Sequence, residues 1–564
     1  MLFRTLLNKR NLPLIFVAVL LIPSIVFGAT SDDSIKVNIV APSQIKPGDT
    51  LKLWVFVSNL KEEFTIQSSQ SALQQVDSLS SSTLTKITIN KIEFENPFQS
   101  KALSQQEKVV NRKLTASGDA LKLRKLLREE LYNKLSTENV TLEQLKAYAD
   151  KEEQLNKLIA KGRHSSLIEI PVPKDSPEGT TVTIPIKVSY SSEGSLSAQS
   201  IDSFIQVTVT SNPVPKKAVI IIVDGAKRDA MYQYADGNSS SYFSELMRSG
   251  AKFTETETIF PSITPPGHAA ILTGTYPKNS GIAGFRWFNK ATREYTDYGD
   301  IWSKITYKVD EDLQAQTIFE ALGPKYTHSV FEFIRKGADE KWYPSAGMLR
   351  DYEAGDLNIP PGSMYWYQKL DKDTTDRVIY ELIPYYSKDL IVLWLAGNDL
   401  IGHKLGPDAT YGTGSMSNVD AQIGRLMNGE TQVECDEFDC YTVTYPGLWD
   451  GETLFVITAD HGQTEVTKDD AHAITQNEVV NDLYPKGYYC YGVPYVYIED
   501  ADCVVAPNGG MAQIYIQNGL TFGDGSVYDG TWTLPPTWND IYPAVDYFYP
   551  QPYVDTVLVK YQGS

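Results

Sequence analysis

The residues from Phe260 to Pro277 place a hydroxyl group directly before two prolines and an apolar run. Because proline is favoured in the first turn of a helix, Thr264, followed by Pro265 and Pro266, is expected at a helix N-terminus. Unpaired backbone N–H groups and the positive end of the helix dipole favour an anion there, such as a phosphoryl group. Taken alone, a threonine at this position is more often an N-cap than a reacting group.

Outside this segment, carboxylates follow three stretches that are typical of buried strands. Continuous apolar, β-branched runs suit strands covered on both faces of a parallel sheet, and here they span 218–223, 390–395 and 453–458. These runs lead to Asp224, Asp399 and Asp460. Ligands of open α/β sheets bind just beyond the carboxyl ends of the strands. We therefore expect the three carboxylates to converge on one place.

Two histidines stand beside these aspartates. Asp399 and His403 are four residues apart, one helical turn or a tight loop, so both can face one ion. Asp460 and His461 are adjacent. Mixed His and Asp ligation without cysteine suits zinc, with manganese or another divalent ion as the alternative. A strand-end turn or a helix cap would explain any one of these residues equally well, so the hypothesis of a metal site depends on the whole set.

As a set, these motifs resemble the alkaline phosphatase superfamily and, within it, the type I phosphodiesterase and nucleotide pyrophosphatase branch. The resemblance covers roughly residues 217–515, with the motifs in the family's order. They are Val-Asp224-Gly, Phe-Pro-Ser-Ile-Thr264-Pro-Pro-Gly-His268 with Thr-Gly-Thr-Tyr-Pro277, Asn-Asp399-Leu-Ile-Gly-His403, and Thr-Ala-Asp460-His461-Gly462. Each motif alone is weak, whereas the ordered set is specific.

The resemblance implies a phosphoesterase with two divalent metal ions side by side, zinc with manganese as the alternative. Carried over by motif, one ion is held by Asp224, Thr264, Asp460 and His461, and the other by Asp399, His403 and a downstream histidine, for which this chain offers His472. Thr264 would attack phosphorus, and water would hydrolyse the phosphothreonine intermediate. Ser262 is the rival hydroxyl, and His268 is interpreted as supporting the helix.

The chain departs from the family pattern after Pro277. Phe285 stands where many members of the family have an asparagine that contacts the phosphoryl oxygen. Arg286 or Asn289 could supply the missing donor and are the candidate substrate-binding residues, although each is about as well explained as a surface or packing residue. The departure leaves open the choice between diester and monoester substrates.

The expected fold class is α/β, with an alkaline-phosphatase-like core whose mostly parallel central sheet is flanked by helices. We expect this catalytic domain at 217–564. A β-sandwich domain is predicted at 33–210 from half-buried alternation around turn residues. An antiparallel helical hairpin is predicted as an insertion at about 117–162, its charges most simply forming a solvated face. Basic residues before an apolar run predict a signal peptide at 1–28, with an uncleaved membrane anchor as the alternative.

Composition narrows the function classes. The formal net charge of −19 argues against nucleic acid as the main partner, because polyanions are normally met by a basic surface. Four late cysteines fit export and predict local disulfides, Cys435–Cys440 and Cys490–Cys503. The expected protein is secreted, periplasmic or on the cell surface, and the family resemblance implies a small phosphate ester as its substrate, with a nucleotide as one candidate. The sequence does not indicate the oligomeric state.

The sequence also bears on three alternatives to a phosphodiesterase. A phosphomonoesterase of the same superfamily is the nearest. A sulfatase is disfavoured, because the chain has no Cys/Ser-x-Pro-x-Arg motif. A cell-surface adhesion or scaffold protein with a vestigial catalytic domain belongs to another class, and the intact ligand set argues against it.

Overall fold

The structure is a computed structural model of the 564-residue chain. The part that it describes comprises residues 34–67, 70–79, 84–99, 104–137, 140–195, 197–298, 305–351, 365–407, 414–435, 440–465, 474–492, 501–520 and 530–560. The predicted signal peptide at 1–28 lies outside this part. None of the helices within the described ranges has both the length and the apolar composition that a membrane crossing requires.

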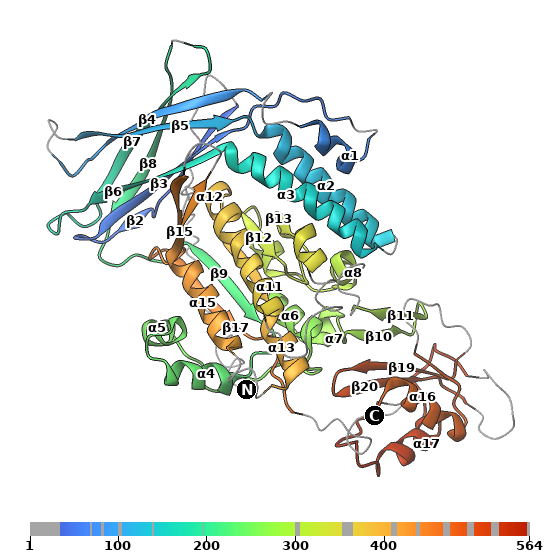
Figure 1. Cartoon of the computed structure of the whole chain (residues 1–564). Helices are drawn as coiled ribbons and strands as arrows, with labels where there is room; N and C mark the ends of the chain where they lie inside the picture. The colour runs from blue at the N-terminus through green and yellow to red at the C-terminus, as the bar shows by residue number, and fades with distance from the viewer. Residues whose placement is uncertain are drawn as a thin grey trace.

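A five-stranded parallel sheet forms the centre of the C-terminal half (Figure 1). In pairing order its strands are β13 (Glu340–Trp342), β12 (Thr327–Val330), β14 (Leu390–Leu395), β9 (Lys217–Val223) and β17 (Thr453–Thr458). Every adjacent pair is parallel, and Leu393 of β14 lies opposite Ile221 of β9. The α/β fold with a parallel sheet, predicted from the apolar runs, is confirmed.

Helices cover both faces of this sheet, because alternate side chains of β9 point to opposite sides. Ile221 and Val223 join one apolar core, whereas Ile222 belongs to another. The first core is completed by α4 (Arg228–Gly237), α5 (Tyr242–Ser249) and α15 (Ser415–Asn428). The second is completed by α6 (Thr264–Thr273), α8 (Ile305–Asp312) and α9 (Ile318–Leu322).

The strand β17 is less buried than its apolar run predicts. Leu454 is 50% exposed and Val456 is 37% exposed, so the expectation of a strand buried on both faces is wrong here. The reason is the strand order, because β17 lies at the edge of the described sheet and pairs with β9 alone.

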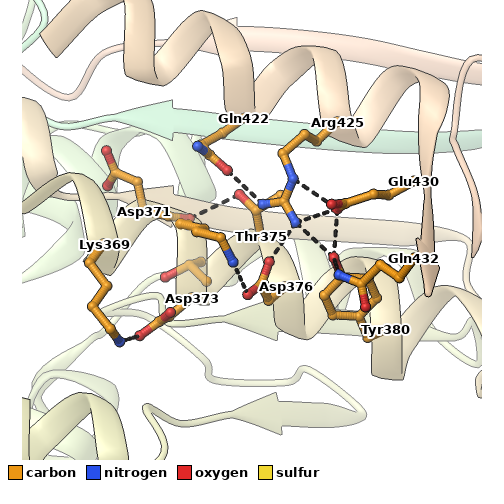
Figure 2. Close-up of polar contacts among 12 residues, drawn as sticks. Lys369, Asp371, Asp373, Thr375, Asp376, Tyr380, Gln422, Arg425, Glu430 and Gln432 are labelled. Atoms are coloured by element: carbon orange, nitrogen blue, oxygen red, sulfur yellow. Dashed lines mark hydrogen bonds and ion pairs between the residues drawn. The ribbon is translucent and has the colours of Figure 1, made fainter. Parts of the chain in front are cut away.

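A polar network fastens the long helix beside the sheet to its neighbours (Figure 2). This helix runs from α11 (Tyr365–Asp376) through a π-helical turn, η3 (Arg377–Leu382), into α12 (Ile383–Tyr385). Arg425 of α15 contacts Asp376 at 2.5 Å and donates from Nε to Glu430 at 3.0 Å. Tyr380 donates to the same carboxylate at 2.6 Å. The network therefore joins α11, α15 and β15 (Gly429–Cys435).

Residues before β9 form two sheets that share one apolar core. The first has the order β1-β3-β6, from β1 (Ile35–Val40), β3 (Thr50–Asn59) and β6 (Arg163–Pro171). The second has the order β2-β8-β7-β4-β5, from β2 (Gln44–Ile45), β8 (Gln199–Val209), β7 (Thr181–Ser192), β4 (Lys86–Glu95) and β5 (Gln105–Thr115). Sequence pattern did not single out β4 and β5, and most residues of β5 are exposed or half-buried.

Two helices, α2 (Gly118–Thr137) and α3 (Leu142–Lys161), stand between β5 and β6 and lie side by side (Figure 1). The Thr141 hydroxyl accepts from the Gln144 N–H, and the Gln144 side chain accepts from the Thr141 N–H, so the two residues form a capping box at the start of α3. The helix α2 contacts the C-terminal half of the chain, because Tyr132 donates its hydroxyl to the carbonyl of Pro344 at 2.7 Å.

Part of the charge on these helices is buried against η3, so the expectation of a simply solvated face is wrong for this part. Arg128 donates to Glu152 at 2.6 Å, and Arg124 pairs with Glu381 of η3 at 2.9 Å. Burial opposes ionisation of Glu381, but Arg124, Arg377 and Arg128 hold the pKa of its carboxyl well below the ordinary range. Opposite charges from elements distant in sequence meet here, which helical periodicity cannot indicate.

The C-terminal region carries two small sheets and two further helices. A hairpin of β10 (Arg286–Asn289) and β11 (Glu294–Asp297) lies beside a sheet of β18 (Cys490–Tyr491), β19 (Cys503–Asn508) and β20 (Met511–Ile516) (Figure 1). The helices are α16 (Gln476–Leu483) and α17 (Trp538–Phe548). The predicted Cys490–Cys503 disulfide is confirmed. The strand β15 pairs with β16 (Cys440–Pro446), so that Cys435 lies opposite Cys440. Cys440 is disulfide-bonded.

Candidate active site and metal centre

Thr264 is the first residue of α6, and its side chain is buried. The N-cap position belongs to Ile263, so the expected capping role of Thr264 is wrong. Its hydroxyl points elsewhere: Oγ1 lies 3.1 Å from Nε2 of His461 and 3.5 Å from Oδ1 of Asp224. A hydroxyl not engaged in capping is available to a ligand at this point.

The first turn of α6 also offers fewer amide donors than a typical helix start. Pro265 and Pro266 have no N–H, and the N–H of Gly267 is already bonded to the carbonyl of Ile263 at 3.0 Å. Thr264 is therefore the only one of the first three helical residues with a backbone donor. The dipole still favours an anion, but most of the positive charge at this site must come from elsewhere.

Two strand ends bring acidic side chains to this hydroxyl, because parallel neighbours end at the same edge of the sheet. Asp224 follows β9, while Asp460 and His461 follow β17. The ligand atoms of these three buried residues all lie within 4.8 Å of one another. His461 Nδ1 donates to the carbonyl of Gly462 at 2.8 Å, which leaves Nε2 facing Asp224 Oδ1 at 3.3 Å and Asp460 Oδ2 at 3.4 Å.

The second pair of candidate ligands lies on α13 (Gly397–Leu405). Nε2 of His403 is 3.2 Å from Oδ2 of Asp399 one turn earlier. Gln463, directly after the Asp460-His461-Gly462 motif, donates its amide to Oδ1 of Asp399 and to its carbonyl oxygen. Asp399 is buried whereas His403 is exposed, so this pair lies between the buried cluster and solvent.

The carboxylates repel one another in a dry site. Burial and the negative charge of Asp224 raise the pKa of Asp460 to about 8, and burial with the charge of Asp399 also raises the pKa of Asp224. Burial would lower the pKa of His461, but its hydrogen bond to Asp224 and the charges of Asp460 and Asp224 raise it to about 10. The cluster thus gains stability from added positive charge.

A divalent cation fits this cluster. Oδ2 of Asp460 is buried and has no hydrogen-bond partner among the described residues, although it faces the other ligand atoms. Two carboxylates, an imidazole nitrogen and a hydroxyl are a donor set that zinc or manganese accepts. The backbone of α6 also packs closely against the cluster at Gly267, because a Cβ atom there would lie 2.7 Å from the backbone carbonyl oxygen of Asp460.

Three residues that the sequence analysis does not identify support these ligands, namely Trp394, Glu332 and Gln463. Trp394 of β14 donates its indole N–H to Oδ2 of Asp224 at 2.8 Å. His268 bonds Glu332 through Nδ1, and its Nε2 lies 3.6 Å from Oδ2 of Asp460. Gln463 is the third. Trp394 is the only residue of its apolar run with a polar side-chain atom, and Gln463 follows a predicted motif, whereas nothing in the sequence marks Glu332.

The remaining predicted site residues are His472, Arg286 and Asn289. His472 lies outside the described residues. Arg286 pairs through Nε with Asp297 across the β10–β11 hairpin at 2.7 Å, and the side-chain oxygen Oδ1 of Asn289 accepts from the backbone N–H groups of Ala291 and Thr292 in the hairpin turn. Phe285, at the position of the missing asparagine, packs edge-on against Phe333.

Comparison with known proteins finds one matching family. The model of the type I phosphodiesterase / nucleotide pyrophosphatase family matches residues 218–517. The bis(5'-adenosyl)-triphosphatase enpp4 of Xenopus laevis is 22% identical over 260 residues, 46% of this chain and 49% of that protein. Human ectonucleotide pyrophosphatase/phosphodiesterase family member 5 is 21% identical over 270 residues, 47% of this chain and 48% of that protein.

The match to these relatives is partial. The chain spans about half the length of the curated relatives it matches. Among solved structures, murine ectonucleotide pyrophosphatase/phosphodiesterase 5 aligns over 59% of this chain and 75% of that chain, with 15% identity and a TM-score of 0.36.

Proposed function

Because the chain belongs to the type I phosphodiesterase / nucleotide pyrophosphatase family of the alkaline phosphatase superfamily, we propose that it is an exported two-metal phosphoesterase. It hydrolyses phosphodiester or nucleotide pyrophosphate bonds through a phosphothreonine intermediate on Thr264. One observation carries the proposal: the Thr264 hydroxyl, free of any capping role, lies 3.1 Å from Nε2 of His461 and 3.5 Å from Oδ1 of Asp224.

Two sets of residues would hold the metal ions. The first set is Asp224, Thr264, Asp460 and His461, and the second is Asp399, His403 and His472. When bound, zinc or manganese stabilises the threonine alkoxide and neutralises charge on the phosphoryl and leaving oxygens. The pairing of Asp399 with His403 on one turn of α13 supports the second set, and His472 enters it on sequence grounds alone.

The chain's own residues supply the nucleophile and its orientation. Thr264 Oγ1 forms a bond to phosphorus as the bond to the leaving oxygen breaks, and the hydroxyl proton passes to solvent. Water then cleaves the phosphothreonine, which releases the phosphate product and restores the hydroxyl. The buried start of α6 fixes the direction of attack, since Gly267 packs directly on Asp460.

Substrate choice is proposed to lie in the β10–β11 hairpin. Phe285 replaces a polar donor by an apolar ring, and Arg286 and Asn289 remain the candidate substrate contacts. Each would have to exchange its present partner for substrate. A phosphomonoesterase of the same superfamily is therefore the second candidate, favoured by this loss of a phosphoryl contact.

The rest of the chain is proposed to form an N-terminal β-sandwich domain at 33–210, with the helical hairpin as its insertion, next to a catalytic domain at 217–564. The shared apolar core of the two N-terminal sheets supports this division. The contacts of Arg124 and Tyr132 support a fixed arrangement of the hairpin against the catalytic domain. The export signal and the secreted, periplasmic or cell-surface location are proposed from residues 1–28.

Metal content and two rates test the proposed function. Purified protein is expected to contain zinc or manganese and to hydrolyse p-nitrophenyl phosphate, bis(p-nitrophenyl) phosphate or both, with chelation abolishing turnover. The ratio of the two rates distinguishes the monoesterase from the diesterase. Protein that binds neither metal and hydrolyses neither ester would refute the enzyme and leave the scaffold alternative.

A further inference from the structure

The helix α6 reaches the metal-binding cluster at two points one turn apart. Thr264 contacts His461 and Asp224, and His268, four residues later on the same face, approaches Asp460. The imidazole of His268 is fully buried, and it lies between two carboxyl groups. Its Nδ1 is hydrogen-bonded to Oε1 of Glu332, while its Nε2 lies 3.6 Å from Oδ2 of Asp460.

The backbone aims Glu332 at this imidazole. Glu332 follows the end of β12, and the residue before it, Phe331, has a φ of +54°. This left-handed conformation is costly for a bulky residue and persists only when its surroundings enforce it. Phe331 is held by its N–H bond to the carbonyl of Trp342 at 2.9 Å and by stacking on Trp394 at 5.0 Å.

The two carboxyl groups and the imidazole between them each keep one atom without a hydrogen bond. Nε2 of His268, Oδ2 of Asp460 and Oε2 of Glu332 are all buried without a hydrogen-bond partner among the described residues. A buried polar atom in this state costs free energy. A bound cation would satisfy Oδ2 of Asp460, and Nε2 of His268, which lies 3.6 Å from the same oxygen, would restrain the carboxylate.

We propose that Glu332 and His268 are positioning residues, which act through each other to hold the Asp460 carboxylate in place for the metal ion of the first set. Neither residue touches substrate. The inference rests on the proposed function only in requiring that a metal ion bind at Asp460. Trp394 performs the corresponding task for Asp224 by direct donation of its indole N–H.

Metal affinity separates this role from a merely structural one. The variants are Glu332→Gln and His268→Gln, with His328→Gln as the matched control. His328 is also buried, but its ring nitrogens bond Ser387 and Trp342 at 2.7 and 3.2 Å, not the cluster. Affinities for zinc and cobalt are measured by chelator competition, together with the cobalt absorption spectrum and the thermal midpoint.

We expect both cluster variants to bind metal about 10- to 100-fold more weakly, with an altered cobalt spectrum. His328→Gln is expected to lose thermal stability while keeping wild-type affinity. Wild-type affinity in both folded cluster variants would overturn the proposal. If His268→Gln does not fold, the milder Glu332→Gln decides alone, supported by Glu332→Asp, which keeps the charge and shortens the reach.

The outcome is separable from that of the proposed function. If wild-type protein binds metal but hydrolyses neither ester, the hydrolase fails and the affinities still decide the roles of Glu332 and His268. If wild-type protein hydrolyses ester and both variants keep its affinity, the positioning role fails and the hydrolase stands. Absence of metal binding in wild-type protein would overturn both.

Discussion

Trp394 donates its indole N–H to Oδ2 of Asp224 at 2.8 Å, from the strand next to the one that Asp224 follows. The bond holds one oxygen of the carboxylate and leaves Oδ1 facing His461 and Thr264. A side chain whose strand appears purely apolar in the sequence thus orients a candidate metal ligand.

Replacing Trp394 by Phe keeps an aromatic ring and removes only the donor. We expect metal affinity about 10-fold below wild type and a loss of about 1–2 kcal/mol in the free energy of unfolding. Chelator competition and urea unfolding measure the two effects. The control is Trp342→Phe, which removes the donor to His328 and should lower stability without changing affinity. Equal affinities in the two variants would contradict the assignment.

Asp371 is expected to make stability fall as pH rises from about 4 to about 7. Its carboxyl accepts from the Gly397 N–H at 2.9 Å and from Asn418 at 3.1 Å, but burial raises its pKa to about 7. Between the unfolded pKa near 4 and pH 7, the folded state binds the extra proton, so the slope of unfolding free energy against pH is negative.

Asp371 lies on α11, at one end of the polar network in Figure 2. The substitution Asp371→Asn removes its titration. Relative to wild type, the variant should gain up to about 4 kcal/mol between pH 4 and pH 8, the free-energy equivalent of a shift of about three pH units. Urea unfolding of both proteins at the two pH values checks the sign. A stability difference between variant and wild type that does not vary with pH would show that Asp371 ionises normally.

Glu152 tests whether the buried charges of the helical hairpin stabilise the fold. Glu152 is buried, bonds Arg128 and accepts from the Ala346 N–H at 2.7 Å. Glu152→Gln leaves Arg128 short of a counter-charge and should cost about 3–5 kcal/mol of unfolding free energy. The control is the neighbouring Glu153, which pairs with Lys157 at the surface. Glu153→Gln should change the free energy of unfolding by less than about 0.5 kcal/mol. Similar losses in both variants would refute the distinction.

The sequence could predict the parts of the site that are local. Asp224 and Asp460 follow apolar runs, and parallel strands end at one edge, so their convergence follows from pattern and sheet geometry. The i, i+4 pairing of Asp399 with His403 follows from helical spacing. The disulfide between Cys490 and Cys503 was predicted by proximity in the chain, and strand pairing brings these residues together.

The parts that the sequence could not predict depend on tertiary contacts. Glu332 meets His268 only because β12 ends beside the first turns of α6, and Arg124 meets Glu381 only because the hairpin packs on η3. The capping expectation for Thr264 failed for a local reason, since the helix begins one residue earlier than that role requires. A helix that begins at Thr264 and a helix that begins at Pro265 differ by a single residue in register.

The central claim is that Thr264 is the nucleophile, and the turnover of Thr264→Ala tests it most directly. Release of p-nitrophenol from the mono- and diester substrates is measured for this variant and for Ser262→Ala, with circular dichroism to show that both fold. We expect Thr264→Ala to lose at least about 10³-fold in kcat, whereas Ser262→Ala keeps activity near that of wild type. Near-wild-type turnover in folded Thr264→Ala would contradict the covalent mechanism.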